Sequence, residues 1–349
     1  MAKTLQPVRV DRQPSLNLRL STVKQNTPDP FIFAVLAVSA YLLVGSMPLR
    51  ASQVSDATRC RVVNLMPPFW MFWDAAKDQP QSAPLLQFDE MVVKEHPEVY
   101  RESVLSVGRD APDLKAQIAD FLRGAPANIT AMRKLSKSLE GDLPLYLIDF
   151  SKDVPEFLLA RTPIYFLVSL GVFDEGVRPV NGYPTLLFGV DVIARMGIRR
   201  TSLAALFDHE LFHIYHRQIT GMGGGRGDPL YRALWEEGLA TYVSAVLNPR
   251  DSESAILGRP EDLAARARPL LSQIARELLK NMDSTSPDLY QSFFLGNSAR
   301  KDIPPRSGYY VGLLIAREPA QSYSLQQLAE MNRRSLRSTI RRILQKMAH

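Results

Sequence analysis

The chain has 349 residues, of which 46% are hydrophobic, enough for a packed core in one large domain or two small ones. Its formal net charge of +6 at pH 7 is a mild basic excess, which weakly suggests an anionic surface as a neighbour. Cys60 is the only cysteine, and this excludes an intrachain disulfide and a zinc site built from several thiolates.

The N-terminal segment, residues 1–50, has the pattern of a membrane anchor. A polar, basic stretch precedes an uncharged run from Phe31 to Leu49, about 19 residues long, at the border between a signal peptide and a membrane-spanning helix. Because the basic flank comes first, we expect the N-terminus in the cytoplasm and the rest of the chain outside, in the periplasm or extracellular space. We expect anchoring at the inner or plasma membrane; a cleaved, secreted form and a buried core helix are the alternatives.

Residues 51–95 are predicted to form an irregular linker, because prolines recur through this stretch. Its aromatic cluster, Phe69 to Trp73, is expected to pack onto the domain, and a position at the membrane interface is the alternative. The catalytic domain is predicted over residues 96–349, beginning with helical patterns that extend to about residue 140.

Three short apolar runs follow and are predicted to be strands: Leu143–Phe150, Thr162–Gly171 and Pro184–Val192. Each is rich in β-forming residues and is bounded by Gly, Pro, Asn or Asp. From about residue 201 to the end the pattern is helical. The sequence therefore predicts an α+β fold, in which a small mixed sheet precedes a mainly helical C-terminal half.

The strongest chemical signal is a His-Glu-x-x-His motif on the first helix of that half. Thr201 or Ser202 is expected to cap this helix, and His209 and His213 lie four residues apart on it. This spacing places both imidazoles on one helix face, about one turn apart, so that both can bind one metal ion. Glu210 is rotated by about 100° and lies beside the metal, where it can take a proton from a zinc-activated water.

A zinc site for hydrolysis needs a third protein ligand and leaves the fourth position to water. His216 lies three residues beyond the motif, and we expect no direct metal contact from it. No other histidine follows at a short distance. The remaining candidates are carboxylates in a second helical pattern, residues 229–242, which contains Glu236 and Glu237.

At these residues the chain resembles the gluzincin metallopeptidases, in which a glutamate on a second helix, often before Gly-x-Ala, is the third zinc ligand. The segment Trp235–Ala240, Trp-Glu-Glu-Gly-Leu-Ala, is similar to that motif. The resemblance implies a gluzincin fold similar to thermolysin, with Glu237 as the third ligand. It leaves Glu236 as an ordinary surface charge or a neighbouring acid.

The chain is also similar, over about residues 140–346, to a bacterial group of predicted zinc-dependent proteases. That group shares a helix of the form Gly-Tyr-x-x-Gly-x-x-Ile, here Gly308–Ile315, followed by a Ser-Leu-x-x-Leu segment at Ser324–Leu328. By this resemblance Tyr309 would donate a hydrogen bond to the oxyanion. Tyr310 could take that role instead, and packing in a helix core is the alternative for either tyrosine.

The gluzincin resemblance has further implications. An edge strand above the metal pairs with the substrate in that group, and Thr185–Val190 is similar to it, although a core strand would have the same pattern. The Gly-x-Met-Glu-Asn signature of the aminopeptidase N family is absent, which favours an endopeptidase. Thr241 replaces the aspartate of thermolysin-type enzymes, so support for the zinc ligands must come from elsewhere, for example from Asp208 or from Thr241 itself.

Two other segments can be interpreted either as purely structural or as binding segments. Gly221–Gly227 is expected to be a flexible connection between the ligand helices or a lid, and not a phosphate-binding loop. Near the C-terminus an apolar stripe opposite a row of arginines predicts a docked amphipathic helix, and contact with anionic lipid head groups is the alternative. The stripe consists of Leu336, Ile340, Ile343, Leu344 and Met347.

Together these patterns predict a zinc metallopeptidase with one Zn2+ ion, in which Glu210 is the general base for hydrolysis of peptide bonds. The expected partners are a peptide or protein substrate and the membrane, and no nucleic acid. Three alternatives remain open. They are a catalytically silent binding or scaffold protein, an amide hydrolase acting on a non-protein substrate such as cell-wall peptide, and a helical protein whose motif is coincidental.

Overall fold

The structure is a computed structural model that describes residues 62–76, 83–104, 111–154, 163–197, 200–221, 227–296, 298 and 300–349. The predicted anchor, residues 31–49, and most of the glycine-rich connection, residues 222–226, lie outside these ranges. Among the helices within them, none combines the length and the apolar character needed to cross a membrane.

Within the described residues, a four-stranded sheet with the order β1-β2-β4-β3 confirms the predicted small mixed sheet. The first three strands in this order are parallel, and β3 runs antiparallel to β4. Two of the predicted strands are confirmed as β2 and β4. The strands are β1 (Val62–Asn64), β2 (Ile164–Leu167), β3 (Glu175–Val180) and β4 (Tyr183–Gly189).

A tight hairpin determines which strand lies at the edge of the sheet. Asn181 and Gly182 join β3 to β4 with positive φ angles of 51° and 75°, as a two-residue type I′ turn requires. Because β4 is paired with β2 on one side and β3 on the other, the part of the predicted segment that forms a strand, residues 185–189, is a buried core strand. Its expected place as the substrate-pairing edge is therefore wrong, and β3 forms the edge instead.

The predicted strand Leu143–Phe150 is also wrong, because these residues lie within the long helix α5 (Ile129–Asp153). Their burial follows the helical period: Leu143 and Leu147 are buried, whereas Leu145 is 58% exposed. The run is so uniformly apolar that its sequence does not distinguish a strand from a helix.

The predicted irregular linker has regular structure where it is described. It contains β1 and α1, and the prolines of α1 occupy its first turn, where a missing N–H removes no helical hydrogen bond. Phe69 and Phe72 are fully buried, as expected for packing onto the domain, and the Phe72 ring lies 5.2 Å from that of Phe88. The described helices that precede α5 are α1 (Met66–Ala76), α2 (Ala83–Phe88), α3 (Pro97–Val99) and α4 (Ala111–Gly124), with π-helical turns at Asp89–Val93 and Tyr100–Val104 and a 3-10 turn at Ala125–Ala127.

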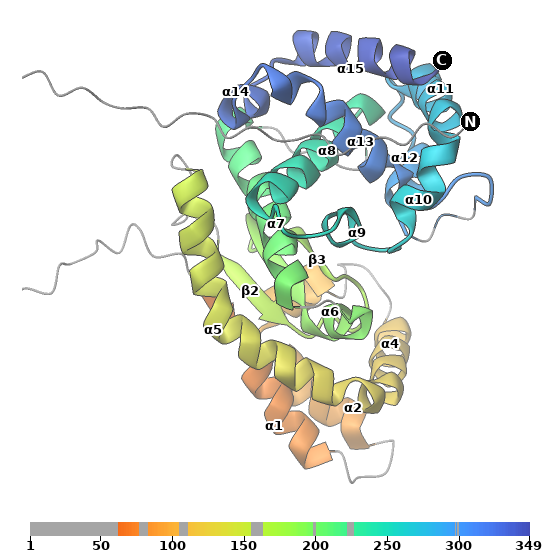
Figure 1. Ribbon diagram of the computed structural model, residues 1–349. Helices are drawn as coiled ribbons and strands as arrows, with labels where there is room; N and C mark the ends of the chain where they lie inside the picture. The colour runs from red at the N-terminus through yellow and green to blue at the C-terminus, as the bar shows by residue number, and fades with distance from the viewer. Residues whose placement is uncertain are drawn as a thin grey trace, which may run out of the picture. The chain divides into compact units, whose positions relative to one another are not determined.

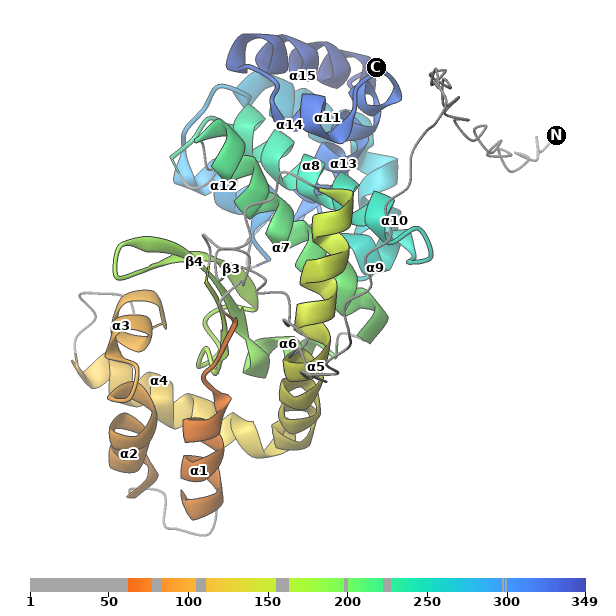
Figure 2. The same ribbon diagram turned by 90° about the vertical axis from the view of Figure 1, so that its left-hand side faces the viewer.

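The C-terminal half is helical, as predicted. Its helix α7 lies between the sheet and the helices that follow (Figures 1 and 2). α7 already begins at Arg200, so the two expected cap residues lie within its first turn. The helices are α6 (Val190–Met196), α7 (Arg200–Thr220), α8 (Leu230–Leu247), α9 (Glu253–Leu257), α10 (Leu263–Ala267), α11 (Leu271–Asn281), α12 (Pro287–Phe294), α13 (Ser307–Arg317), α14 (Leu325–Ala329) and α15 (Arg333–Met347), with 3-10 turns at Arg268–Leu270 and Pro319–Gln321.

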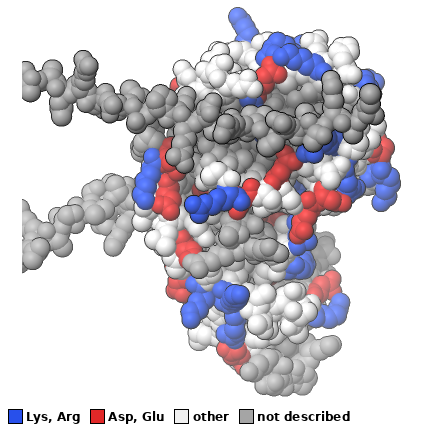
Figure 3. All heavy atoms as spheres, viewed as in Figure 1, with Lys and Arg blue, Asp and Glu red and all other residues white. Residues whose placement is uncertain are grey.

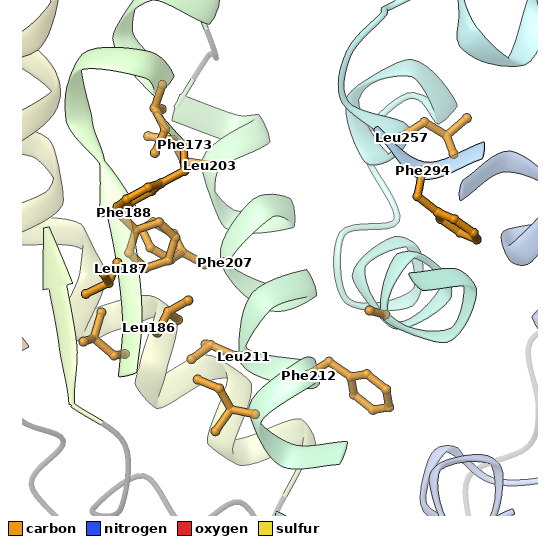
Figure 4. Packing of buried hydrophobic residues seen from close by; sticks show 14 of the residues in the cluster. Phe173, Leu186, Leu187, Phe188, Leu203, Phe207, Leu211, Phe212, Leu257 and Phe294 are labelled. Carbon is orange, nitrogen blue, oxygen red and sulfur yellow. The ribbon is translucent and has the colours of Figure 1, made fainter. Parts of the chain in front are cut away.

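Aromatic packing holds α7 against the sheet. Phe207 of α7 meets Phe188 of β4 edge to face, with ring centroids 4.4 Å apart (Figure 4). Leu203 and Leu211 lie one turn before and after Phe207 and are also buried. An edge-to-face pair of buried aromatic rings contributes about 0.5–1.5 kcal/mol beyond its buried area. This apolar face fixes the rotation of α7, and with it the direction of its polar residues.

Two glycines bring α8 and α13 into backbone contact. A Cβ atom built on Gly238 would lie 2.3 Å from the backbone of Gly312, and one built on Gly312 would lie 2.6 Å from the carbonyl oxygen of Leu234. Any side chain at either position would push the helices apart. The predicted third ligand, Glu237, directly precedes the first of these glycines, so this contact sets its position.

The C-terminal helix α15 docks on the domain through its predicted apolar stripe. Leu336, Ile340, Ile343 and Leu344 are buried, and α15 packs against α11. Beside this stripe Arg337 Nε donates to Asp283, which follows α11, at 2.6 Å. Figure 3 shows Lys and Arg side chains along this helix. The docked helix is thus confirmed, and contact with lipid head groups stays a prediction.

Candidate metal centre

The two histidines of the motif meet a glutamate from the neighbouring helix. His209 Nε2 and His213 Nε2 on α7 lie 3.0 Å apart. Glu237 Oε2 on α8 lies 3.3 Å from the first nitrogen and 3.4 Å from the second. These three side chains are between 12% and 18% exposed. Three side-chain atoms from two helices, each able to bind a metal, therefore converge.

The spacing of these atoms fits a zinc ion. Tetrahedral ligands at about 2.0–2.1 Å from zinc lie about 3.3–3.4 Å from one another. His209, Glu210 and His213 also form a group that could hold a metal ion. However, Glu210 Oε1 lies 4.0 Å from His209 Nε2. Of the two carboxylates, Glu237 fits a ligand position and Glu210 fits the position beside it.

The charges of the two imidazoles and the Glu237 carboxylate support each other. Burial raises the pKa of the Glu237 carboxyl, but the nearby imidazoles, above all His213, outweigh it and hold the pKa well below its ordinary value. Burial lowers the pKa of His213, and the Glu237 carboxylate more than offsets this, raising the pKa to about 9. Burial is the main cause of the raised pKa of Glu210.

The structure separates the two candidate tyrosines. The Tyr309 ring lies nearly parallel to the His209 imidazole, with centroids 6.1 Å apart, and it lines the cavities beside the cluster. The Tyr310 side chain is buried, and its hydroxyl accepts a hydrogen bond from Arg268 Nε at 3.3 Å. Tyr309 is therefore the tyrosine at the site, and Tyr310 belongs to the helix packing.

Glu236 and His216 have structural partners. Glu236 is buried and accepts a hydrogen bond from Arg232 Nη2 at 3.3 Å, so the expected surface charge is wrong. The position of Glu236 in the sequence does not show that α8 is covered by other elements on nearly all sides. His216 is buried against the Phe212 ring, and burial lowers its pKa to about 4. It is not part of the histidine and glutamate cluster, as expected.

The two residues considered as support for the zinc ligands also have other partners. Asp208 accepts a hydrogen bond from Asn248 Nδ2 at 2.7 Å, and burial raises its pKa to about 7. The Thr241 hydroxyl donates to the backbone oxygen of Glu237 at 2.6 Å. Thr241 therefore contacts the backbone of Glu237, whereas Asp208 links α7 to the end of α8 through a hydrogen bond.

Two cavities adjoin the cluster, with volumes of about 410 and 840 Å³. His209 lines the smaller, His213 and Glu237 line the larger, and Glu210 lines both. The cluster is therefore bordered by two cavities, one on the side of His209 and one on the side of His213 and Glu237.

Sequence reasoning missed several residues that line both cavities, among them Glu175 at the start of β3 and Arg306 before α13. The Arg306 guanidinium lies over the Tyr309 ring, 4.3 Å from its centroid. Neither residue belongs to a recognisable motif. The Asn181-Gly182 pair could have revealed the hairpin that places Glu175 at the sheet edge, but it carries no information about the metal.

Comparisons of the chain with protein-family models, with curated proteins and with solved structures gave no match.

Proposed function

We propose that the protein is a zinc metallopeptidase that cleaves peptide bonds, acting as an endopeptidase. The observation that carries the proposal is the convergence of His209, His213 and Glu237 within 3.4 Å of one another, beside two cavities. The buried carboxylate of Glu210 lies directly beside this cluster. The enzyme would act on the non-cytoplasmic side of the membrane, a location that the sequence of residues 1–50 supports.

His209, His213 and Glu237 would hold the metal. Bound zinc would supply a Lewis acid, which would polarise a carbonyl group and lower the pKa of water to about 7. The Glu210 carboxylate takes a proton from the attacking water and passes it to the leaving amine nitrogen, first as a general base and then as a general acid. The Tyr309 hydroxyl donates a hydrogen bond to the carbonyl oxygen as that oxygen gains negative charge.

The edge strand β3 supports a peptide as the substrate. Residues 174–178, at the start of this strand, line the larger cavity together with His213 and Glu237. An extended peptide can add to an exposed sheet edge through backbone hydrogen bonds, which recognise any sequence. Strand β3 would thus align a peptide along the cleft and present one of its bonds to Glu210.

The proposal predicts that hydrolysis depends on a bound metal. Purified protein is expected to contain about one zinc ion per chain by mass spectrometry, because the site offers three protein ligands. Removing this ion with 1,10-phenanthroline should abolish cleavage of a mixed peptide library, and added zinc should restore it. The temperature of unfolding should fall and recover in parallel, because a metal that binds the folded state stabilises it.

Two results would contradict the proposal in different ways. Zinc-containing protein that cleaves nothing in the library would favour a scaffold or an enzyme for a non-peptide substrate. Metal-free protein whose unfolding temperature is unchanged by the chelator or by added zinc would show that there is no metal centre.

Replacing Tyr309 by phenylalanine is expected to lower kcat about 10²- to 10³-fold, because the oxyanion loses a hydrogen-bond donor. The Tyr309→Phe variant should keep its metal and bind substrate with little change, since the ring and its contact with His209 remain. Tyr310→Phe is the matched control and should keep activity within about tenfold, with a slightly lower unfolding temperature, because its hydroxyl bonds to Arg268. Equal losses in kcat for both variants would exclude a specific role for Tyr309.

A further inference from the structure

Glu175 has a buried carboxylate oxygen that no described group satisfies. This residue begins the edge strand β3 and lines both cavities beside the cluster. Its Oε2 atom is inaccessible to solvent and has no hydrogen-bond partner in the part of the chain that the structure describes. An ionised carboxylate accepts several hydrogen bonds, and burying it without partners is costly. The residue as a whole is only partly buried and lines both cavities, so a hydrogen-bond donor that enters them can reach its carboxyl group.

The charges around Glu175 favour a cation as that partner. Burial raises the pKa of Glu175, and the carboxylates of Asp174, Glu210 and Glu237 raise it further, while Arg306 opposes them. Three carboxylates therefore act on the Glu175 carboxyl, and Arg306 is the cation that opposes them. A positive group entering the cleft would be attracted to these carboxylates and would favour the ionised form of Glu175.

The Nε atom of Arg306 does not donate a hydrogen bond to Glu175 Oε2. Its Nε atom is buried and also lacks a hydrogen-bond partner among the described residues. Its guanidinium is held over the Tyr309 ring, and its backbone has a positive φ of 61° just before α13. Few residues other than glycine adopt this conformation without cost, so Arg306 is constrained by its position at the start of the helix.

We propose that Glu175 determines substrate specificity by binding a positively charged group of the peptide next to the cleaved bond. This inference rests on the proposed function, because it places the cation in the same cleft. The group is an ammonium or a guanidinium, which forms charge-assisted hydrogen bonds with a carboxylate. In an endopeptidase it comes from a lysine or arginine side chain. The amino terminus of the peptide is the other source and would make the enzyme an aminopeptidase, and the experiment distinguishes the two.

The test measures binding rather than cleavage, in a Glu210→Gln background that blocks hydrolysis. Four peptides of one sequence are compared by calorimetry. They carry either lysine or norleucine at one position, and either a free or an acetylated amino terminus. Each is titrated into this background and into the same protein with the added change Glu175→Gln, which keeps the size of the side chain and removes its charge.

We expect Glu175→Gln to weaken binding of cationic peptides about 10- to 100-fold, the range for a lost charge-assisted hydrogen bond in a buried site. The acetylated norleucine peptide should change less than about twofold. A loss that needs the free amino terminus would identify that source, and a loss that needs lysine would identify a side chain. Glu261→Gln is the matched control, because this acid lines the smaller cavity but is 77% exposed, and it should change binding less than about threefold.

Equal weakening of all four peptides, or no weakening of any, would overturn the inference. Glu175→Asp is the second variant: it keeps the charge and should retain part of the preference for cations. The inference and the proposed function fail separately. Wild-type protein that cleaves cationic and neutral peptides equally well contradicts only the role of Glu175. Protein that binds cations through Glu175 but never cleaves them contradicts only the peptidase.

Discussion

The Glu210→Gln variant is expected to cleave peptides about 10²- to 10⁴-fold more slowly than the wild type while it keeps its metal. Glutamine has nearly the same shape as glutamate, but its amide cannot take a proton from water. The Glu210 carboxylate stands at 4.0 Å from His209 Nε2, whereas Glu237 stands at 3.3 Å, so the loss should fall on proton transfer and not on metal binding. The measurement is kcat at saturating peptide, with zinc per chain determined on the same samples.

A control variant separates this effect from a general disturbance of α7. Asp208 directly precedes the motif, is also buried, and accepts a hydrogen bond from Asn248. An asparagine can accept the same bond, so Asp208→Asn should reduce kcat less than about tenfold. Undiminished cleavage by Glu210→Gln would exclude this residue as the general base.

Removal of the Glu237 carboxylate, the proposed third ligand, is expected to remove the metal itself. In Glu237→Ala two imidazoles remain, and we expect the affinity for zinc to fall by at least about 100-fold, more than the loss for most residues that only support a ligand. A 100-fold weaker affinity corresponds to about 2.7 kcal/mol less stabilisation of the folded state by a given excess of zinc. Competition titration with a chromogenic chelator measures the affinity, and thermal unfolding with and without zinc measures the stabilisation.

The neighbouring glutamate provides the control for this prediction. Glu236 is also on α8 and more deeply buried than Glu237, but its partner is Arg232. Glu236→Gln can keep a hydrogen bond to that arginine, so we expect it to bind zinc within about tenfold of the wild type. Full zinc retention by Glu237→Ala would disprove the ligand assignment, and loss of zinc only in the Glu236 variant would reverse it.

The sequence revealed the part of the site that local spacing determines. His209, Glu210 and His213 are set by the period of one helix, and this period does not depend on the rest of the fold. Glu237 lies 24 positions after His213 and was expected from a resemblance, which the distances between the side chains support. Glu175 could not be found in this way, because it reaches the cleft through strand pairing and is far from the motif in sequence.

The fold was predictable to a similar extent. The α+β class, two of the strands and the helical C-terminal half followed from periodicity and turn residues. The run Leu143–Phe150 was assigned to a strand because a continuous apolar stretch has no visible period, and only packing shows that α5 continues through it. The helix α1 was missed because its prolines suggested irregular chain, although both occupy positions that a helix tolerates.

The contact between Gly238 and Gly312 also sets the register of α8 against α13. A slip of one residue would move α13 by about 1.5 Å and turn it by about 100°, which would take Tyr309 away from His209. Because the two backbones touch, such a slip would carry a side chain into a gap that admits none. Glu237 and Tyr309 therefore belong to one rigid unit. Any widening of the cleft to admit a substrate is expected between this unit and β3, and not within the helix pair.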